Sequence, residues 1–349
     1  MIIKIISFII VFSAVILAHE FGHYYFSRRA GIKILELGIG FGPRLFGFLK
    51  DKTLYTLNLF PLGGFIRIAG IEPEGETKDD KYTEEESYQK KRPSQKFMSV
   101  FGGPLFNILL AFVIFYVMFV FTGVPKEISN EIATVAPGSV ASKVGIKPGD
   151  KMIAISGKKI IKMMDAVDMI HKSPGKTLLL TIDRKGKILK ISAAPQLNKK
   201  LKIGLIGFSL KPIYARTNPI IALYESLKQV VLTSAIILYT LGLLIIGKIS
   251  ILDLAGPVGI AQFTGQVAGE GIVPLLSFTA FLSINLGLAN LLPIPALDGG
   301  RLVFIIIEWI RKKAIDIKLE NKIHSVGLTI LLGLMAVVTI NDIFRIFRR

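Results

Sequence analysis

Apolar residues occur along this chain in long runs that are separated by stretches rich in charge. Four segments are candidate membrane spans, at residues 1–26, 97–123, 275–310 and 325–340. A helix needs about 20 consecutive apolar residues to cross a bilayer, and the last of these runs is shorter than that. The pattern predicts a polytopic α-helical membrane protein with about four transmembrane helices.

The first segment also has one feature of a secretory signal peptide, because residues 1–18 are apolar and carry only Lys4 as a charged residue. No small-x-small cleavage site follows, and the apolar run continues past His19. We therefore expect an uncleaved first span.

The polar regions between the spans have patterns of their own. Residues 33–70 have the pattern of short strands. Residues 53–59 alternate, Pro61–Gly64 supply a turn and 65–68 return, which predicts a membrane-associated β-hairpin. Its edge could pair with an extended peptide, or the hairpin could only cap the cytoplasmic side. Residues 72–96 have the charge of a solvated linker. Residues 127–198 alternate strands with glycine turns around one helix near 166–171, which predicts a separate α+β domain.

Composition supports a membrane protein and limits its partners. The chain has 349 residues, of which 51% are hydrophobic and 19% are charged, too apolar for an ordinary soluble protein. Its net charge of +18 is spread over loops and over the inserted domain. Contact with anionic lipid headgroups of the bilayer explains this spread better than nucleic acid does. The absence of cysteine excludes disulfides and thiolate metal ligands.

Two of the four histidines lie four positions apart, in the sequence His19-Glu20-Phe21-Gly22-His23 near the end of the first span. On a helix this spacing puts both imidazoles on one face, where they can bind one metal ion. Glu20 lies beside them as a candidate general base. Ionisable residues at membrane depth are unfavourable unless they have a function, which favours a metal site over a chance polar cluster.

A second polar segment could complete this site. Asn290 is followed by Pro293 and Pro295, which end the apolar run of the third span, and then by Asp298. Two histidines and one carboxylate are a typical ligand set for catalytic zinc, although the same set also suits iron. Asp298 could instead cap a helix. Asn290 could bind a substrate carbonyl, or it could only connect neighbouring helices.

Topology links the two halves of the site. If the first span ends in the cytoplasm, the second returns outward and the third inward, which brings Asp298 to the side of His19 and His23. A crossing by residues 220–247 would reverse this order, and the first half of that segment carries charge. We therefore expect 220–247 to lie along the interface or to re-enter the membrane. Basic residues after the first and third spans follow the positive-inside rule, whereas the basic C-terminus does not.

In combination, these motifs resemble those of the site-2 protease family, in its bacterial RseP-like branch. The inserted domain, with Gly145-Ile146-Lys147-Pro148-Gly149-Asp150, looks like a PDZ domain. Many relatives carry two PDZ domains, whereas this chain has room for one. The resemblance extends over nearly the whole chain, through His19–His23, Pro61–Phe65, Phe101–Asn107 and Asn290–Gly299.

The resemblance implies an intramembrane zinc metalloprotease, with Zn²⁺ bound by His19, His23 and Asp298 and with Glu20 as the catalytic base. It implies substrate contacts by Asn290 and by a re-entrant hairpin made of Pro61, Leu62, Gly63, Gly64 and Phe65.

Its substrates would be single-pass membrane proteins, either regulators of the anti-sigma-factor type or remnant signal peptides, and the PDZ domain would take peptide termini. The expected location is the bacterial inner membrane, with the site toward the cytoplasm and the PDZ domain on the outer, periplasmic side.

Two other functions remain open on the sequence. A metal transporter would explain charges within the membrane, but it gives no role to a peptide-binding domain, and the sequence shows no inverted repeat. A catalytically inactive scaffold would have no need to keep Glu20 together with three metal ligands. His171 in the inserted domain and His324 before the last span are not assigned to the metal.

Overall fold

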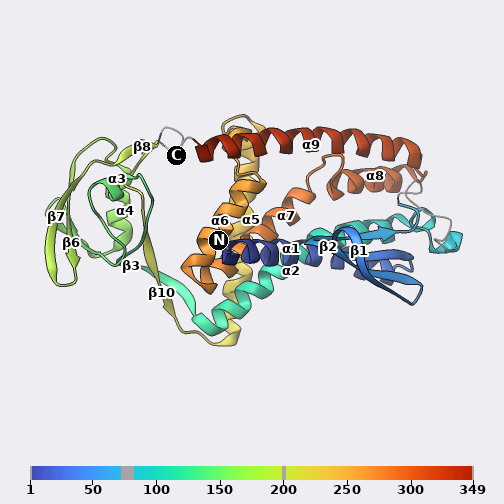
Figure 1. The fold of residues 1–349 in the computed structure, drawn as a ribbon, viewed down its shortest axis with the longest axis horizontal. Helices are drawn as coiled ribbons and strands as arrows, with labels where there is room; N and C mark the ends of the chain where they lie inside the picture. The colour runs from blue at the N-terminus through green and yellow to red at the C-terminus, as the bar shows by residue number, and fades with distance from the viewer. Residues whose placement is uncertain (1, 72–81, 199–201, 348–349) are drawn as a thin grey trace. The chain divides into compact units, whose positions relative to one another are not determined.

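The computed structural model describes residues 2–71, 82–198 and 202–347. They form two compact units (Figure 1), Met1–Met118 with Leu223–Arg349 and, between these in the sequence, Phe119–Ala222. The helices of the first unit, two of which continue into the second, are α1 (Ile2–Arg29), α2 (Pro93–Thr122), α5 (Pro219–Ile245), α6 (Pro257–Glu270), α7 (Ile272–Asn290), α8 (Asp298–Arg311) and α9 (Ile317–Phe347).

Five of the described helices are long and apolar enough to cross a membrane, namely α1, α2, α5, α7 and α9. Large apolar side chains on these helices point outward, as Phe121 does with 83% of its surface exposed. Such exposure is unfavourable in water and favourable in lipid. The expectation of a polytopic helical membrane protein is therefore confirmed, whereas the number of helices that cross stays a prediction.

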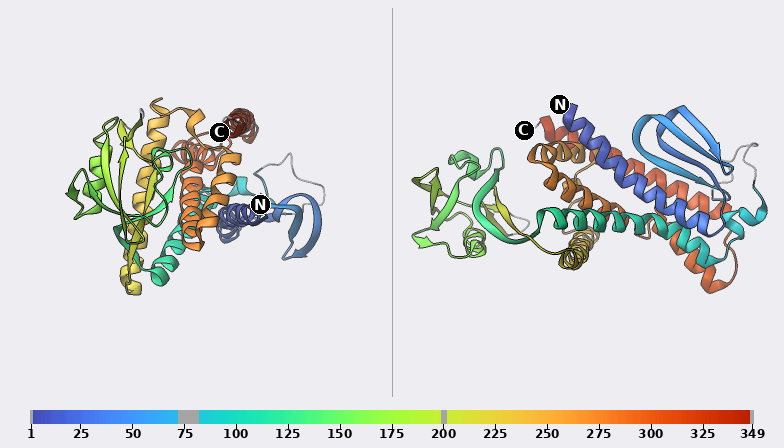
Figure 2. Two further views of the ribbon diagram at one scale, coloured as in Figure 1. Left: turned by 60° about the vertical axis from the view of Figure 1, so that its left-hand side comes forward. Right: turned by 90° about the horizontal axis from the view of Figure 1, so that it is seen from below.

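Helix α5 contains the segment for which an interfacial position was predicted. In Figure 1 it runs across the direction of α1 and α9, and the right-hand view of Figure 2 looks along its axis while those helices lie lengthwise. A helix on the membrane surface would have this orientation relative to helices that cross. The interfacial position itself stays a prediction.

The predicted β region is present as two long strands, β1 (Ile34–Lys50) and β2 (Thr53–Ile68). Their register pairs Leu37 with both Tyr55 and Ile66, so each strand folds back on itself. The resulting order of segments is 44–50, 53–60, 34–41 and 63–68. Segment 63–68 lies at one edge of this sheet, beside 34–41.

This order corrects the predicted hairpin, in which residues 53–59 would pair with 65–68. The two segments instead flank residues 34–41 on opposite sides. The physical reason lies in the turn, because the hydroxyl of Ser13 on α1 donates to the carbonyl of Pro61 at 2.8 Å and accepts the N–H of Gly63 at 3.2 Å. A tight hairpin would use such backbone groups for its own turn hydrogen bond.

The second unit is an α+β domain, as predicted, although it is longer than residues 127–198. Its five-strand path runs in the order β10-β3-β4-β6-β7, and β5 pairs with β4. Strand β10 pairs with β3 from Phe208 opposite Val135 to Ala215 opposite Val124, which a local pattern cannot reveal. The elements are β3 (Val124–Val135), α3 (Val140–Lys143), β4 (Lys151–Ile155), β5 (Lys158–Lys159), α4 (Met163–His171), β6 (Leu178–Arg184), β7 (Lys187–Ala193), β8 (Gln196–Asn198), β9 (Ile203–Leu205) and β10 (Phe208–Ala215).

The predicted linker is only partly as expected. Its residues 72–81 lie outside the described part of the chain, whereas η2 (Glu84–Glu86) and η3 (Tyr88–Lys90) are short 3₁₀ helices. Tyr88 is 3% exposed and packs with Val100 of α2 and Leu302 of α8. The second half of the segment is thus anchored to the helices rather than fully solvated, because the Tyr88 side chain has an apolar site to fill.

Candidate metal centre

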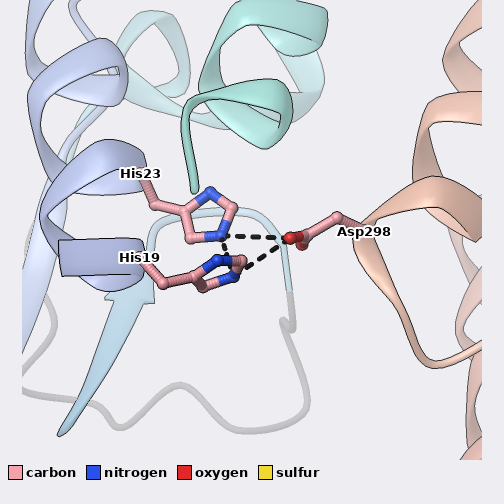
Figure 3. A group of neighbouring side chains, drawn as sticks. All are labelled: His19, His23 and Asp298. Carbon is pink, nitrogen blue, oxygen red and sulfur yellow. Dashed lines mark hydrogen bonds and ion pairs between the residues drawn. The ribbon is translucent and has the colours of Figure 1, made fainter. Parts of the chain in front are cut away.

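Helix α1 presents two histidines on one face, and Asp298 reaches them from the first turn of α8 (Figure 3). His19 Nε2 and His23 Nε2 lie 3.1 Å apart. Asp298 Oδ2 lies 3.1 Å from His19 Nε2 and 3.4 Å from His23 Nε2. The structure therefore brings together the three residues that the sequence proposed as ligands, although they are far apart in the chain.

This triangle has the dimensions of one face of a tetrahedral metal site, in which bonds of about 2.0–2.1 Å place neighbouring ligand atoms roughly 3.3 Å apart. The protonation of the His23 ring agrees with a metal site. His23 Nδ1 lies 2.9 Å from the carbonyl oxygen of Ser99, which can only accept, so Nδ1 carries a proton, and in the neutral ring Nε2 then presents a lone pair. Asp298 Oδ2 is buried without a hydrogen-bond partner among the described residues. Facing lone pairs of this kind fit a bound cation.

The connection between α7 and α8 fixes the position of Asp298. Helix α7 ends at Asn290, and the two prolines that follow cannot donate the hydrogen bonds that would continue it. Gly299 and Gly300 pack against carbonyl oxygens of this connection, where a Cβ would lie 2.1 Å and 2.5 Å away. Asp298 is the first helical residue after the N-cap Leu297, and its carboxylate contacts the histidines. The helix-cap alternative is therefore not what the structure shows.

A cavity of about 320 Å³ adjoins the three residues. Glu20 and Asn290 both line it, so the candidate base and the candidate substrate residue share one space with the candidate ligands. Ile66 and Arg67 line the cavity too, and the backbone N–H of Ile66 faces the Glu20 carboxylate. The edge segment 63–68 thus passes directly beside the proposed base.

The turn for which substrate binding was predicted lies outside the lining of this cavity, and its role stays a prediction. Pro61, Leu62, Gly63, Gly64 and Phe65 are not among the residues that line this cavity. A Cβ on Gly63 or Gly64 would lie 2.7–2.8 Å from side chains of α1, so the turn packs closely against that helix. The residues that do line the cavity, Ile66 and its neighbours, follow this turn directly on the same strand. The substrate-binding residues predicted from the sequence ended at Phe65 and did not include them.

His324 lines the cavity, although the sequence left it unassigned. Its Nδ1 accepts the backbone N–H of Ala296 at 3.0 Å, and Ala296 has a φ of +82°, in the left-handed region. That conformation is unfavourable for a residue other than glycine, so it needs support from its surroundings. His324 supplies this support two residues before Asp298. A lone histidine just before an apolar run gave no sequence signal for such a role.

Comparison with known proteins identifies the family. The sequence profile of peptidase family M50 matches residues 7–334. The chain belongs to peptidase family M50. This membership confirms the resemblance to the site-2 proteases.

Curated relatives align with this M50 peptidase over nearly its full length. Zinc metalloprotease RasP from Geobacillus kaustophilus is 35% identical, with 99% of this chain and 98% of the relative aligned. Regulator of sigma-W protease RasP from Bacillus subtilis is also 35% identical, with 98% and 99% aligned. The first alignment has 418 positions against 349 residues here, so at least 69 positions (418 − 349) have no counterpart in this chain.

A solved structure aligns with a smaller part of the chain. The PDZ domain of an SdrC-like protein from Listeria monocytogenes covers 26% of this M50 peptidase and 88% of its own chain, at 23% identity and a TM-score of 0.21.

Proposed function

We propose that this M50 peptidase is an intramembrane zinc metalloprotease that cleaves transmembrane segments of membrane-bound regulators. The observation that carries the proposal is the convergence of His19, His23 and Asp298 within 4.8 Å, beside a cavity that Glu20 also lines. Helix α1, which supplies three of these four side chains, is apolar enough to cross a membrane. The candidate chemistry is therefore built into a candidate span.

The four residues have distinct roles in peptide hydrolysis. His19, His23 and Asp298 would hold Zn²⁺, the metal in the name of the Geobacillus kaustophilus relative. Zinc supplies Lewis acidity, which makes water nucleophilic near neutral pH. Glu20 accepts the proton of the attacking water and returns it to the leaving amide nitrogen. Asn290, on the wall of the same cavity, donates its side-chain N–H to the substrate carbonyl.

The edge of the β region offers a place for the substrate. A transmembrane helix hides its amides in its own hydrogen bonds, so it must unwind before attack. The outer side of an edge strand can replace the lost bonds by pairing with the extended segment. Because Ile66 faces Glu20, a strand added along 63–68 would pass the proposed base. Pro61–Phe65 would then position the start of this edge on α1 rather than contact the scissile bond.

The remaining assignments follow from the same proposal. The second unit acts as a PDZ domain that takes peptide termini, and it lies on the outer side of the bacterial inner membrane. The metal site faces the cytoplasm, where water reaches it. The sigma-W regulator in the name of the Bacillus subtilis relative supports regulators of the anti-sigma type as substrates, and remnant signal peptides are a second class.

The test uses the full chain in lipid nanodiscs with a synthetic single-pass substrate. The wild-type protein should hold one zinc ion and cleave the substrate, and a chelator should stop cleavage. Glu20→Gln should keep the zinc and lose cleavage, whereas His23→Ala should lose the zinc. Undiminished cleavage by Glu20→Gln, or by protein stripped of zinc, would overturn the proposal.

Substrate pairing has a separate test, because the chain has no cysteine and a single one can be introduced cleanly. In the Glu20→Gln background, a cysteine at Ile68 on the edge should crosslink to alternate positions of a cysteine-scanned substrate. A cysteine at Leu49, in the segment 44–50 on the far side of the sheet, is the matched control and should not crosslink. Equal crosslinking at both positions would exclude the edge as the substrate site.

A further inference from the structure

One face of α2 lies against both imidazoles of the candidate metal centre. Ser99, Gly103 and Asn107 follow one another at intervals of four residues, so they line one side of that helix. All three are buried. We infer that this face of α2 is the outer shell of the metal site, and that Asn107 is a positioning residue that sets the tautomer and the ring orientation of His19. The inference rests on the proposed zinc site and deepens it.

Ser99 acts on His23 through its backbone. Its carbonyl oxygen lies 2.9 Å from His23 Nδ1 and accepts the proton there, which leaves Nε2 free for the metal. A backbone carbonyl inside a helix cannot be removed by substitution. The orientation of His23 is therefore built into the position of α2.

Gly103 allows the helix to approach. A Cβ at this position would lie 2.3 Å from His23 Nε2 and 2.8 Å from His19 Cε1, closer than any ordinary contact. Only a glycine brings the α2 backbone this near to the two rings.

Asn107 acts on His19. Its side chain is 0% exposed, and its amide nitrogen lies 3.2 Å from His19 Nδ1. Its Oδ1 is buried without a hydrogen-bond partner among the residues that the structure describes. When His19 binds a cation through Nε2, its neutral ring carries the proton on Nδ1. A half-turn of the carboxamide, whose two ends are nearly isosteric, then lets Oδ1 accept that proton.

The backbone of Asn107 is fixed independently of the metal. The hydroxyl of Ser283 on α7 donates to the Asn107 carbonyl oxygen at 2.7 Å, and both residues are fully buried. This second contact provides a matched control, because loss of the Ser283 hydroxyl removes one buried hydrogen bond from the same place without touching an imidazole.

The experiment measures zinc affinity of the full chain in nanodiscs by competition with a chelator. Asn107→Leu keeps the volume and removes the acceptor, and zinc should bind about 10- to 100-fold more weakly, as is usual when the partner of a metal-bound histidine is lost. Asn107→Asp keeps an acceptor oxygen and should bind zinc at least as tightly as the wild type. Ser283→Ala should leave zinc affinity unchanged.

A Co²⁺-substituted sample gives a readout that does not depend on activity. The visible absorption bands of Co²⁺ should shift in Asn107→Leu, where the His19 ring is released, and should stay in place in Ser283→Ala. Thermal unfolding of the metal-free variants shows whether Asn107→Leu folds. If it does not fold, Asn107→Asp decides, because zinc affinity no weaker than that of the wild type is required of it.

The outcomes separate this inference from the proposed function. If His23→Ala abolishes zinc binding and Asn107→Leu binds zinc like the wild type, the outer-shell role of Asn107 is refuted and the zinc site stands. If the wild-type protein itself binds no zinc, the proposed function fails first.

Discussion

Replacing Gly103 by alanine adds one methyl group at the point where α2 contacts both imidazoles. The new Cβ would lie 2.3 Å from His23 Nε2, whereas ordinary contacts begin at 3.4 Å, so the helix or the ring must move by about 1.1 Å (3.4 − 2.3). In a well-formed site the metal–ligand distances stay within about 0.2 Å of their standard values. We therefore expect Gly103→Ala to impair the zinc site itself.

The size of the effect follows from the cost of overpacking, about 1–3 kcal/mol. If this strain falls on the zinc-bound arrangement, zinc affinity decreases by roughly 5- to 140-fold, since each 1.4 kcal/mol corresponds to a factor of ten. Helix propensity acts in the opposite direction, because alanine within a helix is more stable than glycine by about 1 kcal/mol. The metal-free protein should consequently keep its fold.

The assay compares Gly103→Ala with Gly333→Ala, in the full chain, by chelator competition and by thermal unfolding with and without zinc. Gly333 lies within α9, and a Cβ there meets nothing within 4 Å. Gly333→Ala should leave zinc affinity unchanged. Wild-type zinc affinity in Gly103→Ala would refute the close approach of α2, and equal losses in both variants would refute its specificity.

Three further predictions concern other parts of the chain. Glu20→Gln should lower the cleavage rate by at least about 100-fold with one zinc retained, as measured by turnover and metal analysis, and normal turnover would contradict its role as base. His324→Leu removes the acceptor for the N–H of Ala296 and should weaken zinc binding, whereas His324→Asn, which keeps an acceptor, should weaken it less; equal effects would argue against this hydrogen bond. In the second unit, two hydrogen bonds of 2.7 Å from Arg184 hold the pKa of Asp150 below its usual range. The stabilisation by Asp150 is therefore complete above the unfolded-state pKa of about 4 and is lost as the pH falls below it. Hydrogen exchange in the full chain measures the stability of the second unit, and Asp150→Asn should abolish this pH dependence of its stability.

The sequence indicated the residues of the candidate metal centre because their signals are local. Two histidines four residues apart on a helix must share a face, and a pair of prolines must interrupt a span wherever it packs. The topological argument then required Asp298 to reach the side of His19 and His23, and the structure brings the three together. Helical spacing thus predicted that His19 and His23 lie together, and topology added Asp298, which is remote from them in sequence.

The pairing of strands could not be obtained in the same way. Alternation at 53–59 and 65–68 marked both segments as strands, but it carries no information on which strand lies beside which. The hydroxyl of Ser13, on helix α1, hydrogen-bonds to the carbonyl of Pro61 and to the N–H of Gly63 in the turn, and the two segments lie apart. The same limit applies to β10, which completes the second unit by pairing with β3 beyond the predicted end of the domain.

By itself, the sequence determined the membrane character of this chain, the helix that carries His19 and His23, and the chemical type of the third candidate ligand. Only the tertiary structure decided what surrounds them: the edge segment beside Glu20, the contact of His324 with the connection before Asp298, and the face of α2 with Gly103 and Asn107. The physical reason is that helical periodicity is a property of neighbouring residues. Helix–helix approach and strand pairing depend on packing between segments that are far apart in the chain, where one missing Cβ or one hydroxyl decides the geometry.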